Sequence, residues 1–352
     1  MSVFGIFKFL DAKYLTKKLL QGHNAQESYK KIIPFLKEKL QILAEEYSSS
    51  KEKLKDIPGT NYTLGLRHMQ RGNISDAIFR FRMVCFLTPE NISAHYNLGR
   101  AFALAGETDN AIKQFERTLE LDSSFIEAKY QLDKIKQPEL IKQVPLNIIK
   151  ETEDYKSEVY QKNYLDLDYN GPLILINELL RNVKDKNPNF EVLDLGCGIG
   201  QSGEYLKQKN VAKRIVGVDI SDKMLEQALK RKVVNQNAYD KVVKEEISRF
   251  LSSHNENYDL IISDLSFCHF GDLDNIAFSI DRILNSGGIL AFILKKNTDL
   301  KSHYKLDLDE DEFTHSELYV KDTFAKFNFN LLSILEVALP EEKKAAAYIF
   351  TK

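Results

Sequence analysis

The sequence predicts a multidomain protein in which an all-α domain of helical repeats precedes an α/β domain built on a largely parallel sheet. Three observations carry this prediction. A period of 34 residues recurs within residues 58–137. Apolar, strand-like runs alternate with helical patterns from about residue 190 onward. A glycine-rich turn joins the first of these strands to a helix. At 352 residues, the chain is long enough for about two domains, each with its own core.

Charge and cysteine content narrow the classes of function. Residues 1–150 hold 23 basic and 17 acidic side chains, a net charge of +6, and the remainder holds 26 and 34, a net charge of −8. The net negative charge of residues 151–352 argues against a nucleic-acid substrate, because phosphate binding favours a basic surface. Three widely spaced cysteines show no metal spacing and indicate a reducing compartment. No run reaches the ~20 apolar residues of a membrane span, so we expect a cytoplasmic protein.

Residues 1–57 are predicted to form an N-terminal helical segment. Apolar residues recur there near the helical period of 3.6 residues between positions 25 and 55. The repeat region then follows at residues 58–137. Its 34-residue offset relates Leu64-Gly65 to Leu98-Gly99, Gly72 to Gly106, Ala77-Ile78 to Ala111-Ile112 and Phe81 to Phe115. Helices are expected at 61–71, 75–87, 94–105 and 109–121, with a capping helix at 126–136.

This pattern resembles the tetratricopeptide repeat, in which small residues let paired helices approach closely. Stacks of such repeats usually contain at least three units, so in this chain, which has two full repeats, flanking elements must cover the ends of the stack. Two interpretations stay open for this module: a groove that binds a protein or peptide partner, and a scaffold for the second domain. Residues 138–150, with Pro138 and Pro145, are predicted to form a linker, and the second domain is expected at residues 151–352.

The second domain is organised around the stretch 192–201, which contains Gly196, Gly198 and Gly200. It follows a predicted strand at 191–195 and precedes a helix, whose first N–H groups are natural partners for an anion or carboxylate. A second apolar strand ends in Asp219, and a carboxylate at this place typically accepts hydrogen bonds from ribose hydroxyls. The glycine turn reads G-x-G-x-G, which lacks the last glycine of the dinucleotide-binding pattern.

The turn and Asp219 resemble motif I of the class I S-adenosylmethionine-dependent methyltransferases, and the resemblance extends over residues 151–352. It implies a Rossmann-like domain with a seven-stranded sheet whose last strand is antiparallel. It also implies S-adenosylmethionine as methyl donor and S-adenosylhomocysteine as product. The residues expected to bind this cofactor are Asp194, Gly196, Cys197, Gly198, Gly200, Asp219, Ile220, Met224, Glu246, Ile247, Asp264 and Leu265.

The resemblance assigns these residues to parts of the cofactor. Asp194 would hold its ammonium group, directly or through a water molecule. Ile220 and Met224 would enclose the adenine, together with Glu246 and Ile247 after a third strand at 241–244. Asp264 and Leu265 follow a fourth strand at 258–264. Later elements are expected as helices at 223–233, 272–284 and 316–328 and strands at 289–294, 330–338 and 344–351.

The acceptor side of the site is less sharply defined. His269 is a candidate general base, because its ordinary pKa lies near neutral pH; it could instead only shape the pocket. Tyr160 and Tyr164 lie in a leading segment that could close over the cofactor as a lid, and His315 could reach the pocket mouth. The acidic run 307–312 could select a cationic substrate or form a solvated loop.

The predicted function is transfer of a methyl group to a small-molecule, carrier-linked or protein acceptor, with no metal required. One alternative is a catalytically inactive adaptor that binds S-adenosylmethionine or S-adenosylhomocysteine and works through its repeats. A dinucleotide-dependent oxidoreductase is disfavoured by the missing glycine and by the antiparallel final strand pair.

Overall fold

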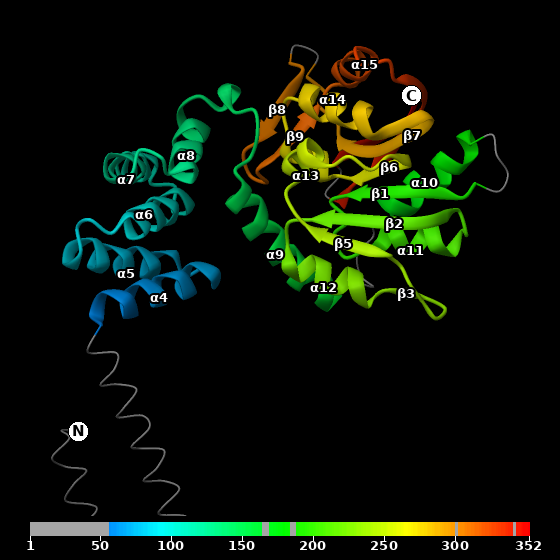
Figure 1. Ribbon diagram of the computed structural model, residues 1–352. Helices are drawn as coiled ribbons and strands as arrows, with labels where there is room; N and C mark the ends of the chain where they lie inside the picture. The colour runs from blue at the N-terminus through cyan, green and yellow to red at the C-terminus, as the bar shows by residue number, and fades with distance from the viewer. Residues whose placement is uncertain (1–55, 164–168, 184–187, 300–301, 341–342) are drawn as a thin grey trace, which may run out of the picture. The chain divides into compact units, whose positions relative to one another are not determined.

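The computed structural model describes residues 56–163, 169–183, 188–299, 302–340 and 343–352, with side chains omitted for 158–163. The predicted N-terminal helical segment, residues 1–57, therefore lies almost wholly outside the described residues. The described chain falls into two compact units, at residues 56–114 and 115–352. Figure 1 shows the elements of each unit with their labels.

The first unit is made of helices α4 (Ile57–Gln70), α5 (Ile74–Leu87) and α6 (Ile92–Leu104) and the start of α7 (Thr108–Leu121). The expected helices are confirmed, with α4 beginning earlier than the prediction because Asp56 caps it by accepting from Gly59 N at 2.8 Å. Gly72 and Gly106 both have positive φ, +74° and +76°, directly after α4 and α6. The chain thus turns in the same way at both positions of the 34-residue period.

The second unit contains a seven-stranded sheet (Figure 1). Its strands are β1 (Phe190–Leu195), β2 (Ala212–Asp219), β5 (Lys241–Lys244), β6 (Tyr258–Asp264), β7 (Leu284–Lys295), β10 (Asn330–Ala338) and β11 (Lys344–Thr351). The order across the sheet is β10-β11-β7-β6-β1-β2-β5. Strand β11 runs antiparallel to both of its neighbours, β10 and β7, and the other neighbouring strands of this sheet pair in parallel. The predicted seven strands and the antiparallel last strand are therefore confirmed.

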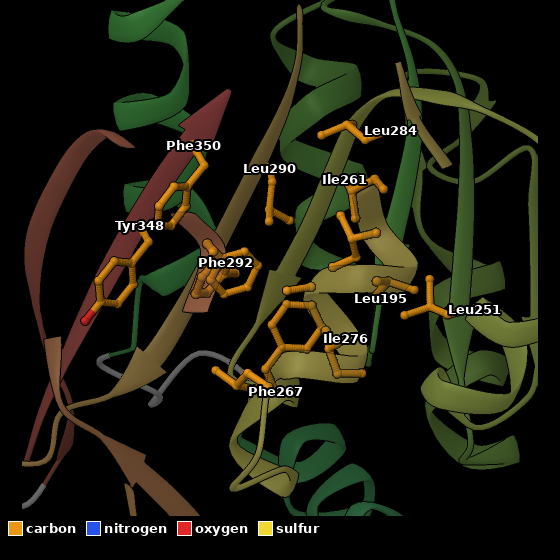
Figure 2. Packing of buried hydrophobic residues seen from close by; sticks show 14 of the residues in the cluster. Leu195, Leu251, Ile261, Phe267, Ile276, Leu284, Leu290, Phe292, Tyr348 and Phe350 are labelled. Carbon is orange, nitrogen blue, oxygen red and sulfur yellow. The ribbon is translucent and has the colours of Figure 1, made fainter. Parts of the chain in front are cut away.

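Helices cover both faces of this sheet. One face packs on α13 (Ile247–Ser253), α14 (Asp274–Ile283) and α15 (Glu317–Ala325), and the other on α10 (Gly171–Asn182), α11 (Gln201–Gln208) and α12 (Asp222–Lys230). Strand β7 serves both cores, because successive side chains from Ile289 to Leu294 alternate between them. Figure 2 shows the first core, where the Phe292 ring stacks on Tyr348 with centroids 5.4 Å apart.

Several elements differ from their sequence-predicted bounds. Helix α12 ends at Lys230 rather than 233, because a short hairpin of β3 (Lys232–Val233) and β4 (Gln236–Asn237) follows it. Strand β7 begins at Leu284, so the segment 285–288 belongs to the strand. Residues 304–315, for which the sequence predicts no strand, form a second hairpin of β8 (Tyr304–Asp307) and β9 (Glu312–His315).

The segment 138–150 is packed, whereas the sequence predicts a free linker. It contains the turn η1 (Pro138–Leu140) and the first residues of α9 (Leu146–Asn163). Val144 N donates to His269 O at 3.0 Å, so the backbone is tied to the second domain. Its apolar side chains form a small core with Tyr130 of α8 (Ile126–Lys136) and two residues of the β8–β9 hairpin. Two prolines indicated an irregular chain but said nothing of this burial.

None of the described helices combines the length and apolar character needed to cross a bilayer.

Candidate active site

A cavity of about 600 Å³ opens where β1, β2, β5 and β6 end at their carboxyl edge. Its size suits a cofactor-sized ligand. Most of the residues predicted to bind a cofactor line it, although they come from five separate parts of the chain. They are Gly196, Cys197, Gly198, Asp219, Ile220, Met224, Glu246, Ile247, Asp264 and Leu265, and His269 joins them.

The glycine turn after β1 forms one wall of the cavity. Gly196 has φ +75°, and a Cβ there would lie 1.8 Å from Ser266 Oγ, so only glycine fits. Gly200 directly precedes α11 and has φ +88°, a backbone conformation that glycine adopts more readily than a residue with a side chain. Gly200 itself does not line the cavity. Beside Gly198 a Cβ would find open space, so the backbone there borders the cavity directly.

Asp219 ends β2 and lies at the centre of the cofactor side. Its carboxylate accepts from Gly198 N and from Ser221 N, both at 2.9 Å. The side chain is only 6% exposed, and this burial raises the pKa of Asp219 to about 6. The residue therefore ties the glycine turn to the start of α12 while its carboxylate faces the cavity.

Asp264 ends β6 on the opposite wall. Burial raises the pKa of its carboxyl to about 7, although the Tyr169 hydroxyl partly opposes this by donating to Oδ1 at 2.5 Å. The next residue, Leu265, has φ +60°, a left-handed conformation that is strained for a bulky side chain. Such strain is often found at functional sites. Tyr169, missing from the predicted set, lines the cavity as well.

Apolar side chains and a helix cap shape the third wall. Met224 is buried, and Ile220 and Ile247 are half-buried. Glu246 caps α13 by accepting from Ser248 N and Arg249 N, each at 2.8 Å. Its carboxylate oxygens therefore already serve the helix, which the predicted adenine contact did not foresee.

Asp194 stands apart from the other residues of the predicted cofactor set. It is 1% exposed and does not line the cavity. Its Oδ2 accepts from the Tyr239 hydroxyl at 2.6 Å, and that hydroxyl in turn accepts from Gly203 N at 3.0 Å. Burial raises the pKa of Asp194 to about 7. The alternation along β1 turns this side chain away from the cavity and into the core beneath the turn.

His269 ends the short turn η3 (Ser266–His269) and lines the cavity. The ring is 8% exposed, with Nε2 3.7 Å from Glu153 Oε1. Its Nδ1 is buried without a hydrogen-bond partner among the described residues. Burial alone would raise the pKa of Glu153, but Lys156 and His269 together hold it below the ordinary value.

A chain of ion pairs, which we call the ion-pair ladder, forms another wall of the cavity. It consists of Glu153, Lys156, Glu312, Lys295, Glu310 and Lys343, all of which line the cavity. They come from α9, the β8–β9 hairpin, the end of β7 and the segment before β11. The sequence did not reveal the ladder, since only the acidic run 307–312 stood out and both interpretations of it treated it as unpaired.

The contacts along the ladder alternate in charge. Lys156 Nζ lies 2.9 Å from Glu153 and 2.8 Å from Glu312. Lys295 Nζ lies 2.5 Å from Glu312 and also pairs with Glu310. Lys343 Nζ then lies 2.6 Å from Glu310. Although burial opposes ionisation, the two ammonium groups lower the pKa of Glu312 to about 2.

The other predicted substrate residues fall outside this arrangement. His315 is 1% exposed and does not line the cavity, and its Nε2 lies 2.8 Å from Phe270 O. We therefore withdraw it as a substrate contact: its place on β9 turns the ring into the protein. Tyr160 lies in α9, but its side chain is outside the described set, and Tyr164 lies outside the described residues.

Helix α9, which belongs to the segment suggested by the sequence as a lid, lines the cavity. Thr152, Glu153 and Lys156 face it. Asp154 accepts from Ser221 Oγ at 2.6 Å, which fastens the helix beside the cofactor wall.

The strand order, with the glycine turn after β1 and the acidic ends of β2 and β6, is that of a Rossmann-like fold. Comparison with known proteins agrees with it. Residues 193–292 match the family model described as "Methyltransferase domain".

Individual relatives match over limited stretches. A malonyl-[acyl-carrier protein] O-methyltransferase from Acetivibrio thermocellus is 32% identical over 108 residues, or 31% of this chain and 36% of that protein. A trans-aconitate 2-methyltransferase from Paracidovorax citrulli is 30% identical over 112 residues, or 32% and 41%. The chain thus spans well under two thirds of the length of these relatives. Among solved structures, an N-methyltransferase from Bradyrhizobium japonicum in complex with S-adenosylhomocysteine has a TM-score of 0.44 and 16% identity, covering 57% of this chain and 98% of the other.

Proposed function

We propose that the protein transfers a methyl group from S-adenosylmethionine to an acceptor, with S-adenosylhomocysteine as product. The observation that carries the proposal is the convergence of the glycine turn, Asp219 and Asp264 on one cavity inside the matched methyltransferase domain. The open space beside Gly198 supports the fit, because the backbone there leaves room for a ligand.

The cofactor supplies an activated methyl group on a sulfonium, so the protein's task is to orient the reactants and exclude water. In this proposal Gly196 and Gly198 border the amino-acid end of the cofactor. Asp219 accepts from the ribose hydroxyls with a carboxylate that two backbone amides already orient. Ile220, Met224 and Ile247 provide apolar contact for the adenine.

Asp264 is proposed to balance the positive charge of the bound cofactor. Its raised pKa means that a nearby cation would favour the ionised carboxylate. Tyr169 holds that carboxylate in place. His269, with Glu153 beside it, is the nearest base for any acceptor that must lose a proton during the reaction.

The acceptor is proposed to be a small molecule or a carrier-linked group. The relatives carry names that specify malonyl and trans-aconitate acceptors, both of which bear carboxylates. A protein acceptor, brought by the helical repeats, is the alternative from the sequence. We further propose that residues 58–137 form a tetratricopeptide-like unit that binds a partner or supports the catalytic domain, and that the protein acts in the cytoplasm.

Calorimetric titration of the full chain with S-adenosylmethionine, S-adenosylhomocysteine and NADH tests the proposal. We expect both sulfur ligands to bind and NADH not to bind. Asp219→Ala should abolish binding, whereas Asp222→Ala, at a neighbouring exposed carboxylate outside the cavity, should leave it unchanged. Failure of both sulfur ligands to bind would reject the proposal.

The second candidate is an inactive adaptor that binds the cofactor only. The adaptor and the enzyme predict the same cofactor binding, so only a measurement of methyl transfer distinguishes them. Release of S-adenosylhomocysteine from S-adenosylmethionine in the presence of an acceptor panel would exclude the adaptor.

A further inference from the structure

Tyr239 packs beneath the glycine turn, although it does not line the cavity and belongs to none of the motifs found in the sequence. It lies in the segment between β4 and β5, and its side chain is 3% exposed. The ring lies against three glycines from different parts of the chain. A Cβ would approach a ring carbon to 3.0 Å at Gly200, 2.5 Å at Gly203 and 2.8 Å at Gly217. The absence of side chains at these three positions therefore creates the space that the ring fills.

The hydroxyl of Tyr239 joins the two elements that flank the turn. It donates to Asp194 Oδ2 at 2.6 Å, near the end of β1, and accepts from Gly203 N at 3.0 Å, in the first turn of α11. The first N–H groups of a helix have no partner within the helix, so Tyr239 supplies a partner that α11 itself lacks. Burial, together with the charge of Asp194, raises the pKa of Tyr239 well above its ordinary value. The hydroxyl therefore keeps the proton that it donates.

The residue that follows Tyr239 fixes its position. Asp240 N donates to Ile215 O at 3.0 Å, and Asp240 Oδ2 accepts from Ile215 N at 2.8 Å. Lys207 Nζ, from α11, lies 3.0 Å from the same carboxylate oxygen. These contacts attach the segment before β5 to both β2 and α11, so the ring is held against the turn from two directions.

The backbone that rests on this ring also borders the cavity. Gln201 and Ser202 line the cavity, and they lie between Gly200 and Gly203, two of the glycines that the ring contacts. The glycine turn directly before them forms the same wall. A shift of the Tyr239 ring would therefore move backbone that faces the proposed cofactor.

We propose that Tyr239 is a positioning residue for S-adenosylmethionine, because it holds the backbone of residues 200–203 in the conformation that receives the cofactor. The inference rests on the proposed methyltransferase function and adds to it a residue from outside the cavity. A tyrosine with a merely structural role would change the free energy of unfolding alone. A loss of stability lowers the apparent affinity only in proportion to the folded fraction, which stays near one in a variant that remains folded. A positioning residue also changes the affinity of the folded protein.

Tyr239→Phe tests this role, because it keeps the ring in its place and removes only the hydroxyl. Gly203 N then loses its partner, and the first turn of α11 is held less firmly. We expect the dissociation constant of S-adenosylhomocysteine to rise by about fivefold, or ~1 kcal/mol, which is the usual net contribution of one hydrogen bond.

Tyr258→Phe is the matched control. The Tyr258 side chain is 0% exposed, and its hydroxyl lies 2.8 Å from His254 Nε2. Tyr258 stands at the amino end of β6, whereas the carboxyl end of that strand reaches the cavity. This variant loses a buried hydroxyl of the same kind far from the glycine turn, so its affinity for S-adenosylhomocysteine should equal that of the unmodified protein.

A second variant makes the test independent of whether Tyr239→Phe folds. Asp240→Ala removes a carboxylate that is 43% exposed and leaves the Tyr239 side chain in place. Because this carboxylate fixes the segment that carries Tyr239, we expect the affinity for S-adenosylhomocysteine to fall by about twofold or more.

The measurement is a calorimetric titration of each full-length variant with S-adenosylhomocysteine, at a temperature at which circular dichroism shows all of them to be folded. An unchanged affinity in Tyr239→Phe would overturn the inference, as would an equal loss in Tyr258→Phe. Should Tyr239→Phe not fold, an unchanged affinity in Asp240→Ala would overturn it instead. In these cases the unmodified protein still binds S-adenosylhomocysteine and the proposed function stands, whereas failure of the unmodified protein to bind would reject both.

Discussion

Raising the pH should tighten the binding of S-adenosylmethionine, because the cofactor is a cation and two carboxyls that face it are held partly neutral in the free protein. The pKa of Asp264 is raised to about 7 and that of Asp219 to about 6, in both cases chiefly by burial. Binding a cation favours the ionised form and so releases protons. Affinity must therefore rise as the pH passes through these values.

The size of the effect follows from the pKa of Asp264. A carboxyl with a pKa of about 7 is ionised in about 9% of molecules at about pH 6 and in about 76% at about pH 7.5. If only the ionised form binds well, the dissociation constant should fall about eightfold. Asp219 adds about a further factor of two by the same arithmetic. This pH range ends below the pKa of the amino group of the cofactor, which is about 8.

Calorimetry in two buffers of different ionisation enthalpy measures both the affinity and the protons released. The control is Asp264→Asn, which removes the main titrating group and should leave only the roughly twofold change from Asp219. A dissociation constant that does not change with pH in the unmodified protein would refute the reasoning. So would an unchanged slope in the variant.

Other substitutions test the structure around the site. Burial lowers the pKa of His315 to about 4, so the unfolded chain takes up a proton at a higher pH than the folded protein does. As the pH falls from about 6.5 to about 4, the unmodified protein should therefore lose up to about 3 kcal/mol of its free energy of unfolding. Urea unfolding should show that His315→Gln lacks this loss. Tyr239→Phe should cost about 2–4 kcal/mol at neutral pH by leaving Asp194 and a backbone amide unsatisfied; an unchanged denaturation midpoint would contradict this. Gly196→Ala should lower the melting temperature more than Gly198→Ala, because both positions have positive φ but only at Gly196 would the added Cβ also collide with a neighbour. Gly198→Ala should in addition weaken S-adenosylhomocysteine binding, and equal melting temperatures for the two variants would count against the turn geometry.

Local patterns were sufficient to predict the sheet and most of the cofactor wall. The strands 258–264 and 344–351 are short, nearly continuous apolar runs, and the structure has both with these bounds. Asp219 and Asp264 could be found because parallel strands bring their carboxyl ends to one edge of a sheet. The glycine turn needed only its own neighbours in sequence to be recognised.

The ion-pair ladder could not be predicted in this way, because its contacts join distant parts of the chain. Glu312 pairs with Lys156, which lies 156 residues earlier. Read locally, the acidic run 307–312 has the composition of a solvated loop. One signal was present: Lys295 is a charged residue at the end of an otherwise apolar strand, and such a residue needs a buried partner.

Asp194 shows a different limit. Its place in the motif predicted contact with the cofactor, but the strand alternates its side chains between two faces. Leu193 and Leu195 enter one core, so Asp194 points to the other, where Tyr239 meets it. Alternation along the strand could have indicated this direction, although it could not have named the partner.

The packing of residues 138–150 has a consequence for how the enzyme can be divided. A fragment that begins at Glu151 would lose Ile141 and Val144 and would expose the apolar side chains of the β8–β9 hairpin that they cover. It would also lose Tyr130, whose hydroxyl donates to Asp311 at 2.7 Å in the turn that bears two ladder glutamates. Helix α8, which ends the predicted repeat region, therefore belongs to the packing of the second unit, and a fragment or fusion that carries this unit would have to include α8.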